Sequence, residues 1–328
     1  MATWGSWIGI QSSGARGSSS GSAGAMKGAT KDAQSDARKA QLVAAARAEL
    51  GGSAAAVDHL LRTGGEEGLT DGQLARWLAA RGWDPARAAR DLAAHAEWRA
   101  AYCPRGRVLD CEIAGQLNQQ KVFIQGLDRC GRAVVILAVA NHIPSPDQSE
   151  VERLFCYTAD AAIALADGDL NPGGLVSFVM DVEGFGLRNY DLKATKTLFQ
   201  MIRQHYVERL SKLYIHKASP LLIQLFRLVS PFIDATTRGK IVFLPHDPTE
   251  CAEVLGRDMD VMMLPPNFGG ASEPRPVEAA WAEIEARRGA ASGLARAASD
   301  SSSGSGADAV VAIAAEAGGG KDTDAAEA

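Results

Sequence analysis

The stretch HYVERLSKLYIHKASPLLIQLFRLVSPFIDATTRGKIVFL (residues 205–244) decides the fold. It holds two strand-length apolar runs, 213–216 and 240–244, and a helical segment over 219–230 lies between them. Apolar runs of this length that alternate with helices are typical of a parallel sheet covered on its faces. The stretch therefore predicts a strand, a helix and a second strand parallel to the first.

The same alternation continues on both sides of this stretch. Further strand-length runs are KVFI (121–124), AVVILAV (133–139), GLVSFVM (174–180) and DVMML (260–264). Further helical segments are 147–167, 190–211 and 248–256. The sequence therefore predicts an α/β body with a largely parallel sheet.

Residues 36–102 have a helical pattern instead. Leu74, Trp77 and Leu78 are spaced to fall on one helix face. Asp84 is a good N-cap, and Pro85 follows at the first helical position, where its missing N–H costs nothing. These signals predict a small helical bundle that precedes the α/β body.

Low-complexity composition marks both ends of the chain. Residues 11–30 and 299–308 are rich in Gly, Ser and Ala, and such segments bury too little apolar surface to become ordered. The expected organisation has four parts. They are a disordered leader (1–35), a helical module (36–104), an α/β domain (105–275), and a helix with a disordered acidic tail (276–328).

Charge and cysteine content limit which cellular compartment and which partners are expected. The formal net charge of −5 argues against a dedicated nucleic-acid binder. The cysteine count of 5 is odd, and free thiols in a reducing, cytoplasmic compartment are the better interpretation. The longest apolar run, residues 133–140, is too short to span a membrane. Residues 1–31 are Ser-rich and free of acid, which leaves an organelle-targeting leader as an alternative.

Enzyme signatures are missing from the sequence. It has no GxSxG, HExxH or P-loop motif, and the histidines show no metal-ligand spacing. Asp181 and Glu183 alternate at a strand end, where a carboxylate either does acid–base work or satisfies backbone donors in a turn. The turn is the favoured interpretation of Asp181. We therefore expect no enzyme, no catalytic residue and no metal site.

Five segments, in the right order, resemble the CRAL-TRIO lipid-transfer family. They are LARWLAARGWDPARAARDLAAHAEWR (74–99), GLDRCGRAVVI (126–136), VSFVMDVEGFGL (176–187), the stretch 205–244, and LPPNFGG (264–270). Ala133 and Val207 replace prolines that are usual in the family. The resemblance covers about residues 69–270.

This resemblance implies a hydrophobic pocket for one lipid, with the sheet as its floor and a mobile helix as its lid. The pattern of residues 220–232 agrees with such a lid, because apolar side chains surround much of a short helix bounded by Pro220 and Pro231. A helix that is apolar on more than one side is either buried or faces an apolar medium. An ordinary core helix is the alternative. The expected pocket and gate residues are Val176, Phe178, Tyr206, Leu221, Leu222, Leu225, Phe226 and Val229.

The family's headgroup site for an inositol lipid falls on Glu208, Thr237 and Lys240. In this assignment Lys240 neutralises the phosphate, Thr237 donates to its oxygen, and Glu208 holds Lys240 or accepts from inositol hydroxyls. A structural Glu208–Lys240 pair without a ligand is the alternative. Val176 and Phe178 stand where choline-lipid carriers have small hydroxyl residues. The resemblance therefore does not favour a choline lipid as a second ligand beside the inositol lipid. That second ligand could be another lipid, a sterol or an isoprenoid-like molecule.

The resulting functional hypothesis is a soluble, monomeric lipid carrier without a cofactor. It binds a phospholipid such as phosphatidylinositol, or another hydrophobic ligand. It contacts a membrane surface transiently from the cytoplasm and binds no nucleic acid. A non-transferring adaptor, which binds a protein partner and keeps a lipid as a structural or regulatory ligand, is the alternative.

Overall fold

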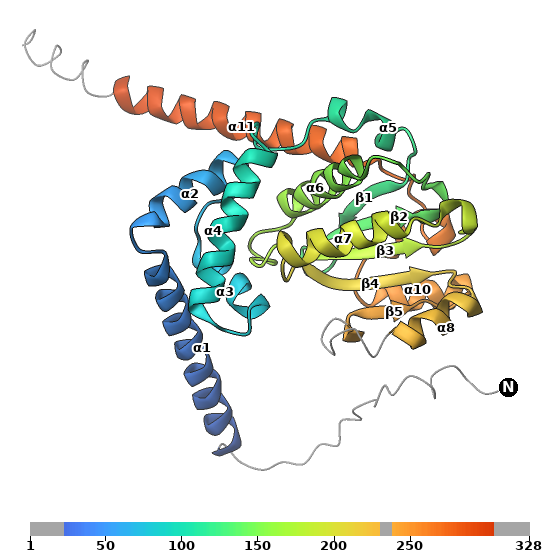
Figure 1. The fold of residues 1–328 in the computed structure, drawn as a ribbon, viewed down its shortest axis with the longest axis horizontal. Helices are drawn as coiled ribbons and strands as arrows, with labels where there is room; N and C mark the ends of the chain where they lie inside the picture. Colours follow the sequence, from blue (N-terminus) through green and yellow to red (C-terminus); the bar gives the residue numbers. More distant parts are fainter. Residues whose placement is uncertain (1–22, 230–237, 305–328) are drawn as a thin grey trace, which may run out of the picture.

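The computed structural model describes residues 23–229 and 238–304 (Figure 1). Within these ranges, the description does not extend to some side chains, namely those of Leu221, Leu225, Leu228, Val229 and residues 23–34 and 291–304. N-terminal helices precede a mixed α/β domain with a five-stranded sheet. This arrangement confirms the predicted fold class.

The N-terminal module consists of α1 (Ala23–Leu50), α2 (Ala54–Thr63), α3 (Asp71–Ala80) and α4 (Pro85–Tyr102). The expected cap is present, because the Asp84 side chain accepts a hydrogen bond from the Arg87 N–H. The buried core includes Leu74, Trp77 and Leu92. Helix α1 begins at Ala23, inside the predicted disordered leader, because the residues after Ala23 include the strong helix formers Ala, Met and Lys.

The sheet consists of β1 (Val122–Leu127), β2 (Ala133–Ala138), β3 (Val176–Asp181), β4 (Leu210–His216) and β5 (Ile241–Phe243), in that spatial order. Strands β2 to β5 are parallel, and β1 pairs antiparallel with β2 at one edge. The prediction of a largely parallel sheet is therefore confirmed. The carboxyl ends of β2 to β5 meet at one edge of the sheet, which we call the carboxyl edge.

Helices cover both faces of the sheet. They are α5 (Ala114–Leu117), α6 (Gln148–Leu165), α7 (Leu192–Gln204), α8 (Pro220–Val229), α10 (Pro248–Gly256) and α11 (Val277–Gly304). Helices α6 and α11 share one apolar cluster with β1, β2 and β3, and α7 packs beside α6. Helix α10 shares another cluster with the opposite side chains of β2, β3 and β4.

The Asp128 carboxylate builds the tight turn between β1 and β2. It accepts hydrogen bonds from the Cys130 and Arg132 N–H groups, from the Arg132 guanidinium, and from the buried Ser177 hydroxyl. Gly131 has a left-handed φ of 72°, which a side chain would strain. The turn therefore fixes the edge hairpin against β3.

Two predicted element boundaries are wrong. Residues 260–264 do not form a strand, because Asp260 caps the short 3₁₀ helix Val261–Met263 by accepting from the Met262 N–H. The helix predicted over 190–211 ends at Gln204, because Leu210 pairs with Val176 and draws the chain into β4. Glu208 takes a left-handed φ of 51° in this transition.

Candidate functional site

Strands β3, β4 and β5 carry an apolar surface on the face away from α10. Because side chains alternate along a strand, Val179, Tyr214 and Val242 point into the α10 cluster. Their neighbours point the other way. We call this set the open sheet face: Phe178, Met180, Leu213, Ile215, Ile241 and Phe243. All of them except Ile215 are half-buried, whereas Val179 and Tyr214 are fully buried. Apolar side chains thus remain partly accessible on this face.

Helix α8 lies against the open sheet face. Leu222 and Ile223 pack against a cluster that contains Ile215. The Phe226 ring meets the Phe243 ring edge-on at 5.1 Å between centroids. Leu222 and Phe226, two of the residues that the sequence assigned to a gate, therefore lie against the open sheet face.

Three other predicted gate residues, Leu221, Leu225 and Val229, belong to α8, but their side chains lie outside the described residues. Phe178, which the sequence assigned to the pocket, is half-buried on the open sheet face. The other strand residue, Val176, lies in the closed core beneath α6.

The structure brings Glu208 and Lys240 together. Glu208 precedes β4 and Lys240 precedes β5, so both lie at the amino ends of adjacent parallel strands. The Lys240 ammonium is 3.8 Å from the Glu208 carboxylate, and their side chains are 25% and 44% exposed. An ion pair at this distance forms no hydrogen bond, so with respect to the described residues the ammonium keeps its donors for another acceptor. The third predicted headgroup residue, Thr237, lies outside the described residues.

Tyr206, also predicted in the pocket, lies in a buried polar network. Its hydroxyl donates to the Asp160 carboxylate (2.9 Å) and accepts from the Arg99 guanidinium (3.1 Å). Arg99 also binds Asp160 at 2.6 Å and the Gly64 carbonyl at 2.7 Å. Burial, followed by the charge of Asp160, raises the pKa of Tyr206 well above its usual range. The network ties the N-terminal module to the segment that carries Glu208.

Asp181 has the turn role that the sequence favoured. Its carboxylate accepts from the Glu183 N–H at 3.1 Å and from the Asn267 amide at 2.9 Å. It also lies 3.1 Å from a ring nitrogen of His216. These contacts join the ends of β3 and β4 to the segment after α10.

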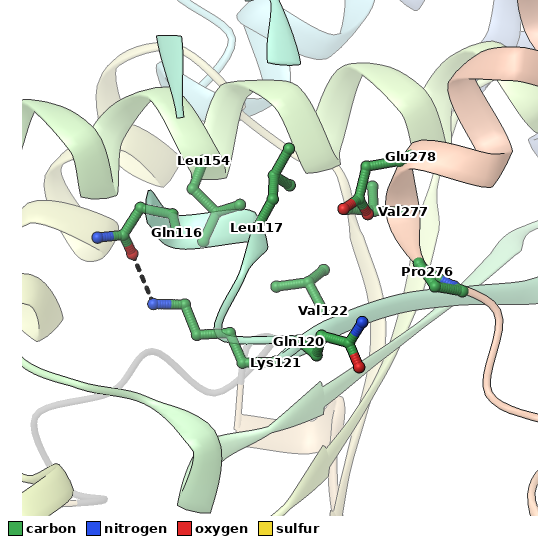
Figure 2. Close-up of a pocket in the computed structure, with 9 residues that line it drawn as sticks. All are labelled: Gln116, Leu117, Gln120, Lys121, Val122, Leu154, Pro276, Val277 and Glu278. Atoms are coloured by element: carbon green, nitrogen blue, oxygen red, sulfur yellow. Dashed lines mark hydrogen bonds between the residues drawn. The ribbon is translucent and has the colours of Figure 1, made fainter. Parts of the chain in front are cut away.

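One small cavity lies away from the open sheet face, near the edge strand β1 (Figure 2). Its volume of about 10 Å³ leaves room for at most one water molecule. Figure 2 shows the Lys121 ammonium pointing to the Gln116 amide, which it binds at 2.6 Å. Burial lowers the pKa of Lys121 to about 8. The cavity is far too small for a lipid.

Sequence reasoning missed part of the open sheet face: Met180, Leu213, Ile215, Ile241 and Phe243. The signal was present, because these residues alternate with the side chains that pack against α10. Side chains on one face recur at every second residue of a strand. Counting in twos from Phe178 on β3, and then taking the paired residues on β4 and β5, identifies the whole face.

Comparison with known proteins gives the family of the α/β domain. The family model described as CRAL/TRIO domain matches residues 117–270. The phosphatidylinositol transfer protein CSR1 of Eremothecium gossypii is 26% identical over 220 residues, which are 62% of this chain and 48% of that protein. The CRAL-TRIO domain-containing protein C3H8.02 of Schizosaccharomyces pombe is 25% identical over 182 residues, which are 53% of this chain and 40% of that protein. The chain thus spans about half the length, or less, of these curated relatives.

A solved structure supports the fold. The crystal structure of Sfh5 superposes with a TM-score of 0.52 at 16% identity and covers 74% of this chain and 96% of that chain. At this level of identity, the likeness concerns the arrangement of helices and strands. Among the described residues, no helix is both long and apolar enough to cross a membrane.

Proposed function

We propose, on the premise that residues 117–270 form a CRAL-TRIO domain, that this chain binds one phosphatidylinositol molecule and transfers or presents it between membranes. The acyl chains lie on the open sheet face, with α8 as the gate. The headgroup lies at the other end of the strands, against Lys240 and Glu208. The proposal needs no cofactor and no covalent step.

The observation that carries this proposal is the partly accessible apolar surface between the sheet and α8. Each CH₂ group that leaves water for such a surface contributes about 0.8 kcal/mol. A surface built from Phe178, Met180, Leu213 and Phe243 offers an acyl chain an environment similar to the bilayer interior. A lipid can therefore leave a membrane without exposing its chains to water.

The chemistry of the Glu208–Lys240 pair suits an inositol phospholipid. An ammonium with unused donors neutralises a phosphodiester, and a carboxylate accepts hydrogen bonds from sugar-like hydroxyls. The name of one relative, a phosphatidylinositol transfer protein, supports the same ligand. We also propose that the carrier is monomeric and cytoplasmic, and that it contacts a membrane surface transiently.

Lipid exchange tests the proposal. The full chain, purified from cells, is expected to carry phosphatidylinositol, identified by mass spectrometry of the extracted lipid. It should also move labelled phosphatidylinositol from donor to acceptor vesicles. Purification without any bound lipid, together with no transfer, would overturn the proposal. A chain that keeps its lipid and never exchanges it would instead be an adaptor with a structural ligand.

A further inference from the structure

An exposed apolar surface lies outside the site described above, on α7 and the turn that precedes it. It consists of Leu187, Tyr190, Leu192, Phe199 and Ile202, and we call it the α7 surface. Leu187 is 94% exposed and Phe199 is 60% exposed. Leu192, Phe199 and Ile202 are spaced to form one stripe along α7, about a quarter to a half of a turn away from the buried Ala194 and Met201. Large apolar side chains gathered in this way mark an interaction surface.

The exposed Leu187 is held in place by its neighbours. It belongs to the short 3₁₀ turn Leu187–Asn189, and the buried Asn189 anchors this turn. The Asn189 amide donates to the carbonyls of Ala140 and His142 at 2.8 and 2.9 Å, and its oxygen accepts from the Gly186 N–H. The turn therefore presents a leucine to the outside on a well-tethered support.

Basic side chains flank the α7 surface. Arg188, Lys193, Lys196 and Arg203 are all exposed. Asp191 is the sole acid in residues 184–204, and it points inward. Its side chain is 7% exposed, caps α7 through the Ala194 N–H, and lies 3.4 Å from His142. Residues 184–204 thus carry four basic side chains and one acid, a net charge of 4 − 1 = +3, whereas the chain as a whole carries −5.

The start of the α7 surface lies at the same end of the sheet as the gate. The segment after β3 and the start of α8 both leave the carboxyl edge of the sheet, and Figure 1 shows the start of α7 and α8 at the same end of the molecule. Val182, which follows β3 directly, packs in one apolar cluster with Ala218 and Leu222 at the start of α8. A flat partner that meets α8 can therefore meet this surface as well.

We propose that the α7 surface docks on an anionic lipid bilayer. The apolar side chains enter the interfacial region, and the flanking lysines and arginines pair with anionic headgroups. This docking places α8 at the bilayer before the gate opens. The inference rests on the proposed function, because membrane contact serves lipid exchange there.

Vesicle flotation with the full chain tests the inference. Wild type is expected to bind vesicles containing phosphatidylserine more tightly than vesicles of phosphatidylcholine alone, and to release them at high salt. The variant Lys193→Gln/Lys196→Gln should bind the anionic vesicles about tenfold or more weakly. The variant Leu187→Asp/Phe199→Asp should lose binding to both kinds of vesicle. Leu170→Asp is the matched control, because Leu170 is 64% exposed but precedes the amino end of β3.

The lipid carried by each variant separates this inference from the proposed function. All variants should retain the lipid found in wild type. Variants that bind vesicles as wild type does would overturn the docking role and leave the carrier function intact. Loss of bound lipid in Leu187→Asp/Phe199→Asp, with unchanged vesicle affinity, would also overturn it, because the α7 surface would then contact the closed gate or a ligand.

Discussion

Nδ1 of His95 on α4 lies 3.1 Å from Nδ1 of His205, at the boundary between the N-terminal module and the α/β domain. The His205 ring stacks on Trp98 at 3.5 Å between centroids, and His95 also binds Glu66 at 2.8 Å. Two protonated imidazoles cannot share this contact. Burial, and then the charge of His95, lowers the pKa of His205 from 6.5 to about 3.

This contact makes stability depend on pH. Between pH 6.5 and pH 3, the unfolded chain binds a proton at residue 205 that the folded chain does not bind. The free energy of unfolding should therefore fall as the pH drops through this window. The variant His205→Phe keeps a ring on Trp98 but cannot titrate, so its urea midpoint should change less between pH 7 and pH 5. The exposed His59→Gln is the control, and an equal slope in His205→Phe and wild type would contradict the assignment.

Arg99 is the second link across the boundary. Its guanidinium is 2% exposed and donates hydrogen bonds to the Asp160 carboxylate, the Tyr206 hydroxyl and the Gly64 carbonyl. Removing one partner of a buried ion pair leaves the other charge uncompensated, so Arg99→Ala should lower the free energy of unfolding by about 3–5 kcal/mol. Arg90→Ala, on the exposed face of the same helix, should change it by less than about 0.5 kcal/mol. Similar urea midpoints for both variants would show that the network contributes little.

The sequence predicted most of the fold because its signals are local. The Asp84–Pro85 start of α4 and the apolar runs of β1 to β5 depend on neighbouring residues alone. The errors arose where tertiary contacts override local preference. Leu210 joins β4 because β3 lies beside it. Residues 260–264 are a different case, because the local cap from Asp260 starts a 3₁₀ helix that the apolar run concealed.

The site was less predictable from local pattern. Glu208 and Lys240 lie far apart in the sequence, and only the family resemblance pointed to both residues together. Val176 and Tyr206 were assigned to the pocket, but their depth depends on α6, and the partners of Tyr206 come from α4 and α6. Strand periodicity gives the face on which a residue lies. It does not tell whether a helix closes over that residue.

Lys240 is expected to govern headgroup selection. A hydrogen bond to a charged group contributes about 1.5–3 kcal/mol, so Lys240→Ala should slow phosphatidylinositol transfer about tenfold or more. The partly exposed pair contributes little to folding, so the thermal midpoint should stay near that of wild type. Lys39→Ala, an exposed lysine on α1, is the control. Unchanged transfer in Lys240→Ala would leave Glu208–Lys240 as a structural pair without a ligand.

Phe226 tests whether α8 is a gate or an ordinary core helix. Its ring rests on Phe243 in the structure, and an aspartate at this position opposes contact with a bilayer when the helix opens. Because a charged side chain is costly in an apolar medium, Phe226→Asp should slow the exchange of every lipid about tenfold or more. Gln224→Asp, on the exposed side of the same helix, should exchange lipids as wild type does. A loss confined to one class of lipid would instead place Phe226 in ligand recognition, and a large drop in thermal stability without slower exchange would mark α8 as a core helix.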